Sequence, residues 1–226
     1  MSCACICACV RACVRACVHT GLAVPLYLAR IIAAARRALN REEFKAAADL
    51  YDKALAEAPG AGLSESQVAA LSAVAGNVHY HLQHHQRARE LFTVALRGVL
   101  NAGGPKPSAT AVELSLKIAS CFASSGDSAA AEGGFLWCIA QAQELAHAHP
   151  DSPDMQSLYG LVVEEYGMFL SAIKRVREAR KQFLEAGRHA ANMKPQPIAG
   201  AAARCFIHAA LCSADLGDTQ QVCFPF

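Results

Sequence analysis

A short pattern of small and aromatic residues recurs four times along the chain and constrains its fold more than any other feature. In each copy a small residue is followed four positions later by an aromatic residue, and three positions after that by a second small residue. The four copies are Ala47, Tyr51 and Ala54; Ala88, Phe92 and Ala95; Ala131, Phe135 and Cys138; and Ala179, Phe183 and Ala186. Residues with these spacings lie on one face of an α-helix. The pattern therefore predicts four helices, each with an aromatic side chain between two close helix contacts.

A second set of small or apolar residues precedes each copy and predicts a partner helix. This set is Ala34, Ala35 and Ala38; Ala75, Gly76 and His79; Ile118, Ala119 and Phe122; and Tyr166, Gly167 and Leu170. Clusters rich in Pro, Gly and Ser separate the units at 58–66, 101–108, 149–154 and 194–200. Gly126-Asp127 and Gly217-Asp218 predict tight turns inside units. Each unit is thus expected to be a helical hairpin, and Ala199–Leu216 is expected to be the first helix of a fifth.

This arrangement resembles the tetratricopeptide repeat, whose small and aromatic positions alternate in the same way. The resemblance covers about residues 28–218, with units spaced 41, 43 and 48 residues apart, which is longer than the usual repeat of about 34 residues. Longer helices and loops, as in the long-repeat subclass, account for the difference. The resemblance implies an all-α fold, a right-handed α-solenoid of four hairpins and the first helix of a fifth, over residues 26–218.

Helix caps are predicted at three places. Asn40 with Glu43, and Thr110 with Glu113, have the spacing of a capping box. Ser152-Pro153 offers an N-cap residue followed by proline at the first helical position.

A closer resemblance is to the mitochondrial family of tetratricopeptide repeat protein 19. It is carried by VELSLKIASCFASSGDSAAAEGGFLWCI (112–139), above all by its segment Leu114–Ser120, and by the flanking units at 30–55 and 166–187. The resemblance implies a non-enzymatic protein on the matrix side of the mitochondrial inner membrane that supports assembly and maintenance of respiratory complex III, with complex III subunits among its partners. The alternative is a generic soluble, cytoplasmic adaptor that binds a peptide or helix of a partner protein.

Charge and composition exclude several classes of protein. The formal net charge is +2, from 21 Lys and Arg against 19 Asp and Glu, so no nucleic-acid partner is expected. The hydrophobic content of 54% excludes a chain that is disordered throughout. The stretch between Arg15 and Arg30 is interrupted by Pro25 and is too short to span a bilayer. Membrane association is therefore expected to be peripheral.

Residues 1–25 form a Cys- and Arg-rich segment of low complexity that is expected to be unstructured. Six of the 11 cysteines fall between Met1 and Val18. The unit Cys-Val-Arg-Ala occurs twice there, at 9–12 and 13–16, and is the translation of a TGCG repeat. Three interpretations are open: translated simple-sequence DNA, a soft-metal site or a mitochondrial presequence. Deleting residues 1–20 is expected to leave the melting temperature unchanged.

The end of the chain, residues 219–226, is expected to be a truncated tail. This segment is too short for a second helix, and Pro225 would interrupt one. The first helix of the fifth hairpin would then expose Phe206 and Leu211, and self-association through this helix is expected.

No residue pattern predicts a catalytic, cofactor-binding or metal site, and the chain is not expected to be an enzyme. His81 and His85 have metal-ligand spacing, but His84 and His85 fall at a predicted turn. Ser171 and Lys174 match a Ser-x-x-Lys pair without its companion motifs. Trp137 is expected to be buried or partly buried.

Function is therefore expected on the surface that the first helices of the hairpins present. A mixed polar groove there suits a helix or an extended segment of a protein partner. The predicted groove residues are Arg36, Asn40, Asn77, Tyr80, His81, Ser120, Ser124, Glu164 and Met168.

Overall fold

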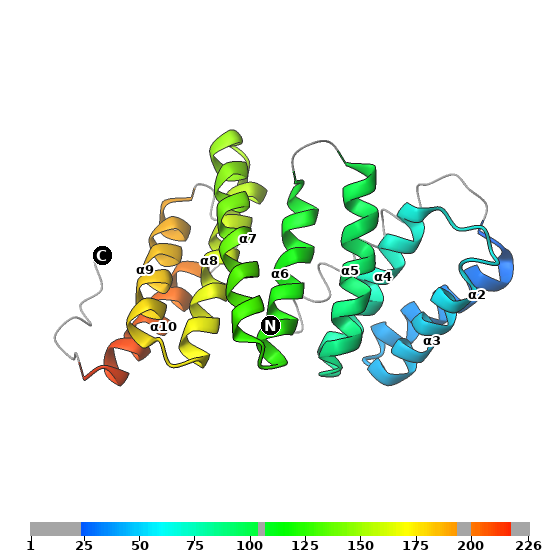
Figure 1. Ribbon diagram of the computed structural model, residues 1–226, viewed down its shortest axis with the longest axis horizontal. Coiled ribbons are helices and arrows are strands. Elements are labelled where there is room, and N and C mark those ends of the chain that lie inside the picture. Colours follow the sequence, from blue (N-terminus) through cyan, green and yellow to red (C-terminus); the bar gives the residue numbers. More distant parts are fainter. Residues whose placement is uncertain (1–23, 104–106, 194–199, 218–226) are drawn as a thin grey trace. The chain divides into compact units, whose positions relative to one another are not determined.

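The computed structural model describes residues 24–103, 107–193 and 200–217 (Figure 1). Within these ranges the chain forms nine α-helices and no strand. The predicted all-α solenoid of helical hairpins is confirmed. The predictions made for segments 1–20 and 219–226 lie outside these ranges.

The helices belong to two compact units, with the division at Ser125/Gly126. Unit 1 contains α2 (Leu26–Asn40), α3 (Phe44–Glu57), α4 (Glu65–His81), α5 (His85–Ala102) and α6 (Ala109–Ser124). Unit 2 contains α7 (Ser128–Ala148), α8 (Pro153–Ala172), α9 (Val176–Asn192) and α10 (Ala201–Asp215). Helices α2 and α3, α4 and α5, and α8 and α9 pack as hairpins, and α10 packs on α9. The two helices of the third predicted hairpin, α6 and α7, fall in different units.

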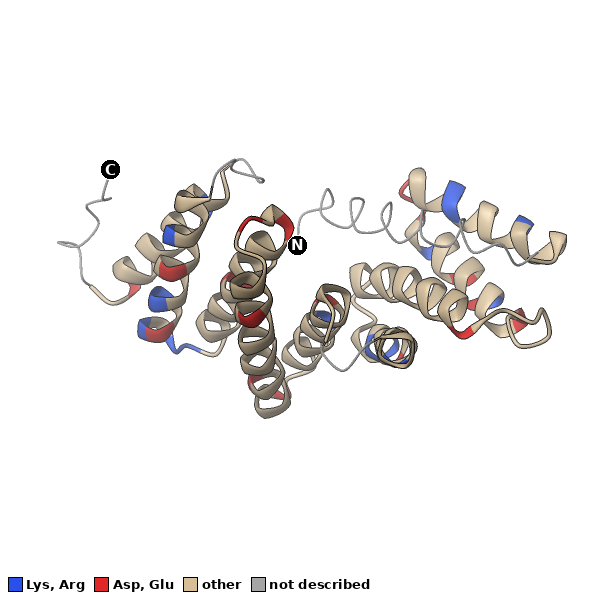
Figure 2. Cartoon of the chain, turned by 90° about the horizontal axis from the view of Figure 1, so that it is seen from above, with Lys and Arg blue, Asp and Glu red and all other residues tan. Residues whose placement is uncertain are grey.

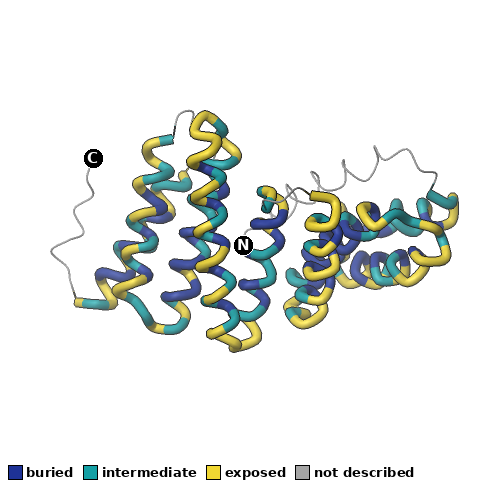
Figure 3. Tube along the Cα trace, turned by 45° about the horizontal axis from the view of Figure 1, so that its top comes forward, coloured by how far each residue is buried: buried dark blue, intermediate teal, exposed yellow. Residues whose placement is uncertain are grey.

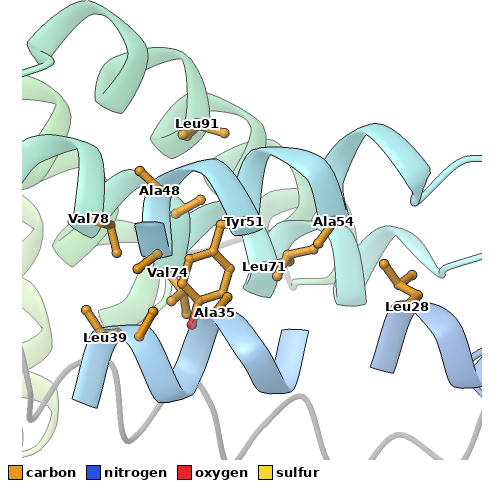
Figure 4. Close-up of a cluster of buried hydrophobic side chains, with 13 residues drawn as sticks. Leu28, Ala35, Leu39, Ala48, Tyr51, Ala54, Leu71, Val74, Val78 and Leu91 are labelled. Carbon is orange, nitrogen blue, oxygen red and sulfur yellow. The ribbon is translucent and has the colours of Figure 1, made fainter. Parts of the chain in front are cut away.

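The recurring small and aromatic residues form the core of each unit. All 12 of them are buried, none with more than 2% of its surface exposed. Buried and exposed stretches follow one another along the helices (Figure 3). In unit 1, Tyr51 of α3 lies beside Ala35 of α2 and Val74 of α4 in one hydrophobic cluster (Figure 4). The predicted register is therefore confirmed in every copy.

In two hairpins, the aromatic ring of the second helix packs over a glycine of the first helix, 16 positions earlier in the sequence. A Cβ atom added to Gly76 would lie 2.7 Å from the Phe92 ring, and one added to Gly167 would lie 2.9 Å from the Phe183 ring. Such distances are far below van der Waals contact, so the small residue is what lets the two helices approach each other. These contacts confirm the partner helices predicted for these two hairpins.

The turns inside the hairpins share one backbone conformation. Four residues at these turns have positive φ, from 61° to 84°: Glu42, Gln83, Gly126 and Lys174. Each of them comes seven positions after the small residue of the preceding helix that was predicted to pack closely. After three of them a backbone N–H bonds back five residues, from Glu43 to Ala38, His84 to His79 and Arg175 to Leu170, at 2.9 Å each. These bonds close a helix end of the Schellman type. The predicted Gly126-Asp127 turn is confirmed, and Gly217 also has positive φ.

Two of the three predicted helix caps are wrong. Asn40 is the last residue of α2, and α3 begins after Glu43 without a side-chain cap, because the left-handed turn residue Glu42 lies between the two helices. Helix α6 is instead capped by Ser108, two residues before Thr110. The Ser108 Oγ accepts a hydrogen bond of 3.2 Å from the Ala111 N–H. The third prediction is confirmed, since Ser152 caps α8 with proline at the first turn.

Sequence reasoning missed the complete capping box of Ser64 and Gln67 at the start of α4. It also missed Asp127, whose side chain accepts a hydrogen bond from the Ala130 N–H and caps α7. Side-chain caps of this kind stabilise a helix by about 1 kcal/mol each.

The cysteines of the helices act as small apolar residues. Cys121, Cys138, Cys205 and Cys212 are buried and unbonded to one another. Burial raises the pKa of Cys121, Cys138 and Cys205 to about 12. These thiols are therefore protonated at neutral pH, as expected for structural cysteines in apolar surroundings.

Helix α10 differs from its prediction on one point. Phe206 is not an exposed flank, because its ring packs over Gly187 of α9, where an added Cβ would lie 2.8 Å away. Ile207 and Leu211 are the exposed apolar residues, at 54% and 57%. The neighbouring α9 carries both basic and acidic residues along its length (Figure 2).

Candidate functional site

The predicted groove residues lie on first helices in both units. Seven belong to α2, α4 and α6 of unit 1, and Glu164 and Met168 belong to α8 of unit 2. They include buried, half-buried and exposed side chains.

Asn77 is at the centre of the unit 1 set. It follows Gly76, the glycine that packs against Phe92, and is 5% exposed. Its side-chain oxygen accepts a hydrogen bond of 2.8 Å from the Lys117 ammonium of α6. Lys117 also lies over the Phe92 ring, 5.5 Å from its centroid. Sequence reasoning missed Lys117, although it precedes Ser120 by three positions and so lies on the same helical face.

Two buried donors of this face have no hydrogen-bond acceptor among the described residues. They are Nδ2 of Asn77 and Nε of Arg36. Arg36 follows the small residue Ala35 of α2, as Asn77 follows Gly76 of α4. The two donors therefore occupy the same position in successive hairpins. An unsatisfied buried donor costs about 1–3 kcal/mol.

The remaining unit 1 residues have simpler surroundings. The His81 ring lies 4.0 Å from that of Phe44, centroid to centroid, and the Tyr80 ring meets His85 edge-on at 5.4 Å. The Ser120 hydroxyl donates to the Leu116 carbonyl within its own helix. Asn40 and Ser124 are exposed at the ends of α2 and α6.

In unit 2, Glu164 belongs to an ion pair that the sequence did not predict. Its two carboxylate oxygens accept from Nε and Nη2 of Arg204 on α10, at 2.5 and 2.7 Å. Glu164 is only 8% exposed, so the carboxylate is held by this two-point contact. Burial raises the pKa of the adjacent Glu165 above its ordinary value. Met168 is 45% exposed.

Two histidines of unit 1, His79 and His84, lie in a hydrogen-bonded row with Asp52. Nε2 of His79 lies 3.0 Å from Oδ2 of Asp52, and its Nδ1 lies 3.3 Å from Nδ1 of His84. Arg87 bonds the other oxygen of Asp52 at 2.7 Å. Burial lowers the pKa of His79, and Asp52 opposes this effect. No three His, Cys, Asp or Glu side chains within the described ranges are placed to hold a metal ion together.

The other residues considered from the sequence lie apart from these contacts. Ser171 lies at the end of α8 and Lys174 in the turn that follows, where the Lys174 N–H donates to the Ser171 carbonyl at 3.1 Å. That turn accounts for their spacing. Trp137 is 40% exposed on α7, next to Leu136 at 51%, because both point away from the buried side that carries Phe135 and Cys138.

Comparisons with known proteins support the repeat fold. No family model matches the chain. Over 110 residues it is 28% identical to the tetratricopeptide repeat protein 19 homolog, mitochondrial, of Drosophila melanogaster. That match covers 49% of this chain and 30% of the fly protein, so the chain spans under a third of its relative. None of the described helices is both long enough and apolar enough to cross a membrane.

Among solved structures, BtubC (BKLC) from P. vanneervenii is similar in fold, with a TM-score of 0.69, 18% identity, and coverage of 97% of this chain and 84% of that one. YrrB, a TPR protein with an unusual peptide-binding site, has a TM-score of 0.48 and 18% identity to this chain. That comparison covers 94% of this chain and 88% of the YrrB chain. With the buried repeat register and the match to the fly protein, the chain is a protein of the tetratricopeptide-repeat fold that is similar, across 49% of its length, to the fly homolog of tetratricopeptide repeat protein 19.

Proposed function

We propose that this chain is a non-enzymatic protein-binding repeat protein of mitochondria that supports the assembly and maintenance of respiratory complex III. It binds a protein partner through the first helices of its hairpins. Its place is the matrix side of the inner membrane, where it associates peripherally.

The observation that carries this proposal is the match to the mitochondrial relative. The match covers 110 residues and agrees with the sequence resemblance to the same family. Binding as the activity is supported by the polar and charged side chains that the first helices carry, among them Arg36 and Asn77. The alternative is a cytoplasmic adaptor that uses the same surface for another protein.

The experiment is to locate the protein and identify what it binds. The full chain with a C-terminal tag is expressed at native level in cells that lack the endogenous protein. Mitochondrial fractionation, protease protection and carbonate extraction are expected to place it on the matrix side, in the extractable fraction. Affinity purification in mild detergent is expected to enrich complex III subunits over those of complex II.

Activity supplies the second readout. Loss of the protein is expected to lower complex III activity while complex II activity is unchanged, and re-expression is expected to restore it. A cytosolic protein without complex III subunits in its eluate would favour the adaptor and contradict the mitochondrial proposal.

A further inference from the structure

We infer that the outer face of α7 is a self-association surface, on which Trp137 of one copy packs over Gly133 of a second copy around a twofold axis. This face is defined by Gly133, Leu136, Trp137 and Ala140. It belongs to a second helix of the repeat, so it is separate from the first helices to which the proposed function assigns partner binding.

The outer face of α7 is apolar where the other second helices are charged. The repeat register aligns these helices at the first small residue of the recurring pattern, and positions two, five, six and nine residues later lie on the side away from the core aromatic. On α7 these positions are Gly133, Leu136, Trp137 and Ala140, and all four are exposed. On each of the other three helices at least two of the same positions are charged and exposed: Asp49 and Lys53 on α3, Glu90 and Arg97 on α5, and Lys181 and Arg188 on α9.

The two large side chains of this face are well exposed for apolar residues. Leu136 is 51% exposed and Trp137 is 40% exposed. A solvated outer face of a helix is ordinarily polar or charged, and tryptophan is among the residues most enriched as anchors at protein interfaces. The face therefore gains free energy when another surface covers it.

The face is also neutral, which suits an identical copy. Between Ser128 and Gln143 the only charged residue is Glu132. Its carboxylate accepts hydrogen bonds of 2.5 Å from Arg175 and 3.1 Å from the Tyr166 hydroxyl, both in unit 2. Two copies of this face meet without like charges opposite each other, and nothing on it selects a charged partner.

Gly133 has no role inside its own unit, although glycine in the middle of a helix lowers stability. Three other helical glycines lie under an aromatic ring of their own unit, and an added Cβ would come within 2.9 Å of that ring: Gly76, Gly167 and Gly187. At Gly133, by contrast, no atom of the described residues lies within 4 Å of an added Cβ. Its position is helical and needs no left-handed conformation. Gly133 is thus an open socket of the kind that this protein fills with aromatic rings.

Trp137 supplies the matching ring when two copies of α7 pack antiparallel. Residues four apart lie one above the other on a helix, about 6 Å apart along its axis. A twofold axis at the level of Phe135 therefore places each Trp137 opposite Gly133 of the other copy. Both contacts form at once, as a closed, isologous dimer requires. Parallel packing would instead bring the two Trp137 rings together and leave the glycines facing each other.

The dimer is expected to be weak, because one helix face is smaller than the roughly 800 Å² per partner of a standard interface. Sedimentation of the full chain over about 1 to 200 μM covers the range in which such contacts dissociate. An excess of reductant is present throughout, because the chain has 11 cysteines. A reversible monomer–dimer equilibrium is expected, with no larger species.

The fluorescence of Trp137 reports on its own contact, because it is the only tryptophan of the chain. Its emission is expected to move to shorter wavelength as the protein concentration rises. The midpoint of that shift should match the dissociation constant from sedimentation. An emission maximum that stays constant while the dimer forms would overturn the inference, because Trp137 would then lie outside the interface.

Variants assign the contact to the two residues. Trp137→Gln and Gly133→Leu are each expected to weaken dimerisation at least tenfold, and Gly133→Ala at least threefold. The Gly133 variants place a side chain in open space of the monomer, so they should keep the helical circular dichroism spectrum. The matched control is Val94→Gln, which removes a 41% exposed apolar side chain from the position of α5 that corresponds to Trp137. It should change the dissociation constant less than twofold.

A mixing experiment tests the pairing of ring and socket. Trp137→Gly leaves two sockets and no ring, and Gly133→Trp leaves two rings and no socket. Each variant alone is expected to dimerise at least tenfold more weakly than the parent. An equimolar mixture is expected to regain dimers, because each ring of one copy then meets a glycine of the other.

Three results would overturn the inference. The first is a chain that remains monomeric at 200 μM, and the second is dimerisation of Trp137→Gln and Gly133→Leu within twofold of the parent. The third is loss of the dimer in Leu211→Gln but not in Trp137→Gln, which would place self-association on α10 instead. The co-purification and localisation experiments of the proposed function do not depend on any of these results.

Discussion

Replacing Gly167 with alanine tests the close contact on which the repeat register depends. The added Cβ would lie 2.9 Å from Cε1 and 3.0 Å from Cδ1 of Phe183, about 0.5–1.1 Å inside the optimal carbon–carbon separation of roughly 3.5–4.0 Å. The ring has little room to move, because Phe183 is 1% exposed and stacks on His208 with a centroid distance of 5.0 Å. Overpacking of this kind costs about 1–3 kcal/mol.

A matched control separates this steric cost from helix propensity. Gly133 of α7 lies in the same unit, and an added Cβ there meets nothing within 4 Å. Gly133→Ala should therefore stabilise the protein by about 0.5–1 kcal/mol, the usual gain from alanine in a helix. Because Gly167→Ala receives the same gain, the difference in unfolding free energy between the variants isolates the clash, and is expected to be about 1–3 kcal/mol.

The assay is urea denaturation followed by circular dichroism at 222 nm, with slope and midpoint both fitted. Adding Phe183→Leu to Gly167→Ala should recover part of the loss, because the shorter side chain vacates the space of the ring. A positive coupling in this double-mutant cycle is expected. Equal unfolding free energies for Gly167→Ala and Gly133→Ala would refute the packing argument.

Four further outcomes are expected. Lys174→Gly should stabilise the protein by about 1 kcal/mol, because Lys174 holds φ at 66°, which is costly for any residue with a Cβ; an unchanged urea midpoint would contradict this. Phe92→Ala should cost roughly 3–5 kcal/mol by leaving a cavity in unit 1, seen as a lower urea midpoint. The lowered pKa of His79 means that the unfolded chain takes up a proton that the folded chain does not, so stability is full above pH 6.5 and falls as pH drops below it; His79→Gln should flatten this dependence in melts between pH 5 and 8. Cys121 and Cys138, with pKa values of about 12, should react with iodoacetamide at pH 8 only after unfolding, as peptide mass mapping would show.

Much of the fold could be predicted from the sequence because the repeat pattern depends only on residues that lie close together along the chain. The helical period places Ala131, Phe135 and Cys138 on one face whatever surrounds them, and an apolar face of small residues must be buried against another helix. Four copies in the same register left little choice of architecture. All members of this pattern proved to be buried.

The helix ends were predicted less well because two local signals compete there. Asn40 and Glu43 have capping-box spacing, but the chain instead closes α2 with a left-handed residue at Glu42 and a backbone bond from Glu43 to Ala38. Both solutions satisfy backbone groups at a helix end. Which of them forms depends on where the next helix must begin in order to pack.

The chemistry of the candidate site depended on contacts that only the tertiary structure creates. The sequence alone placed Asn77 and Glu164 on first helices, but not their partners Lys117 and Arg204, each 40 residues away. Periodicity determines the face of a helix on which a residue lies. The angle and offset between neighbouring helices determine which side chain it meets. That geometry leaves the Asn77 amide with a buried donor, while the same kind of contact engages both carboxylate oxygens of Glu164.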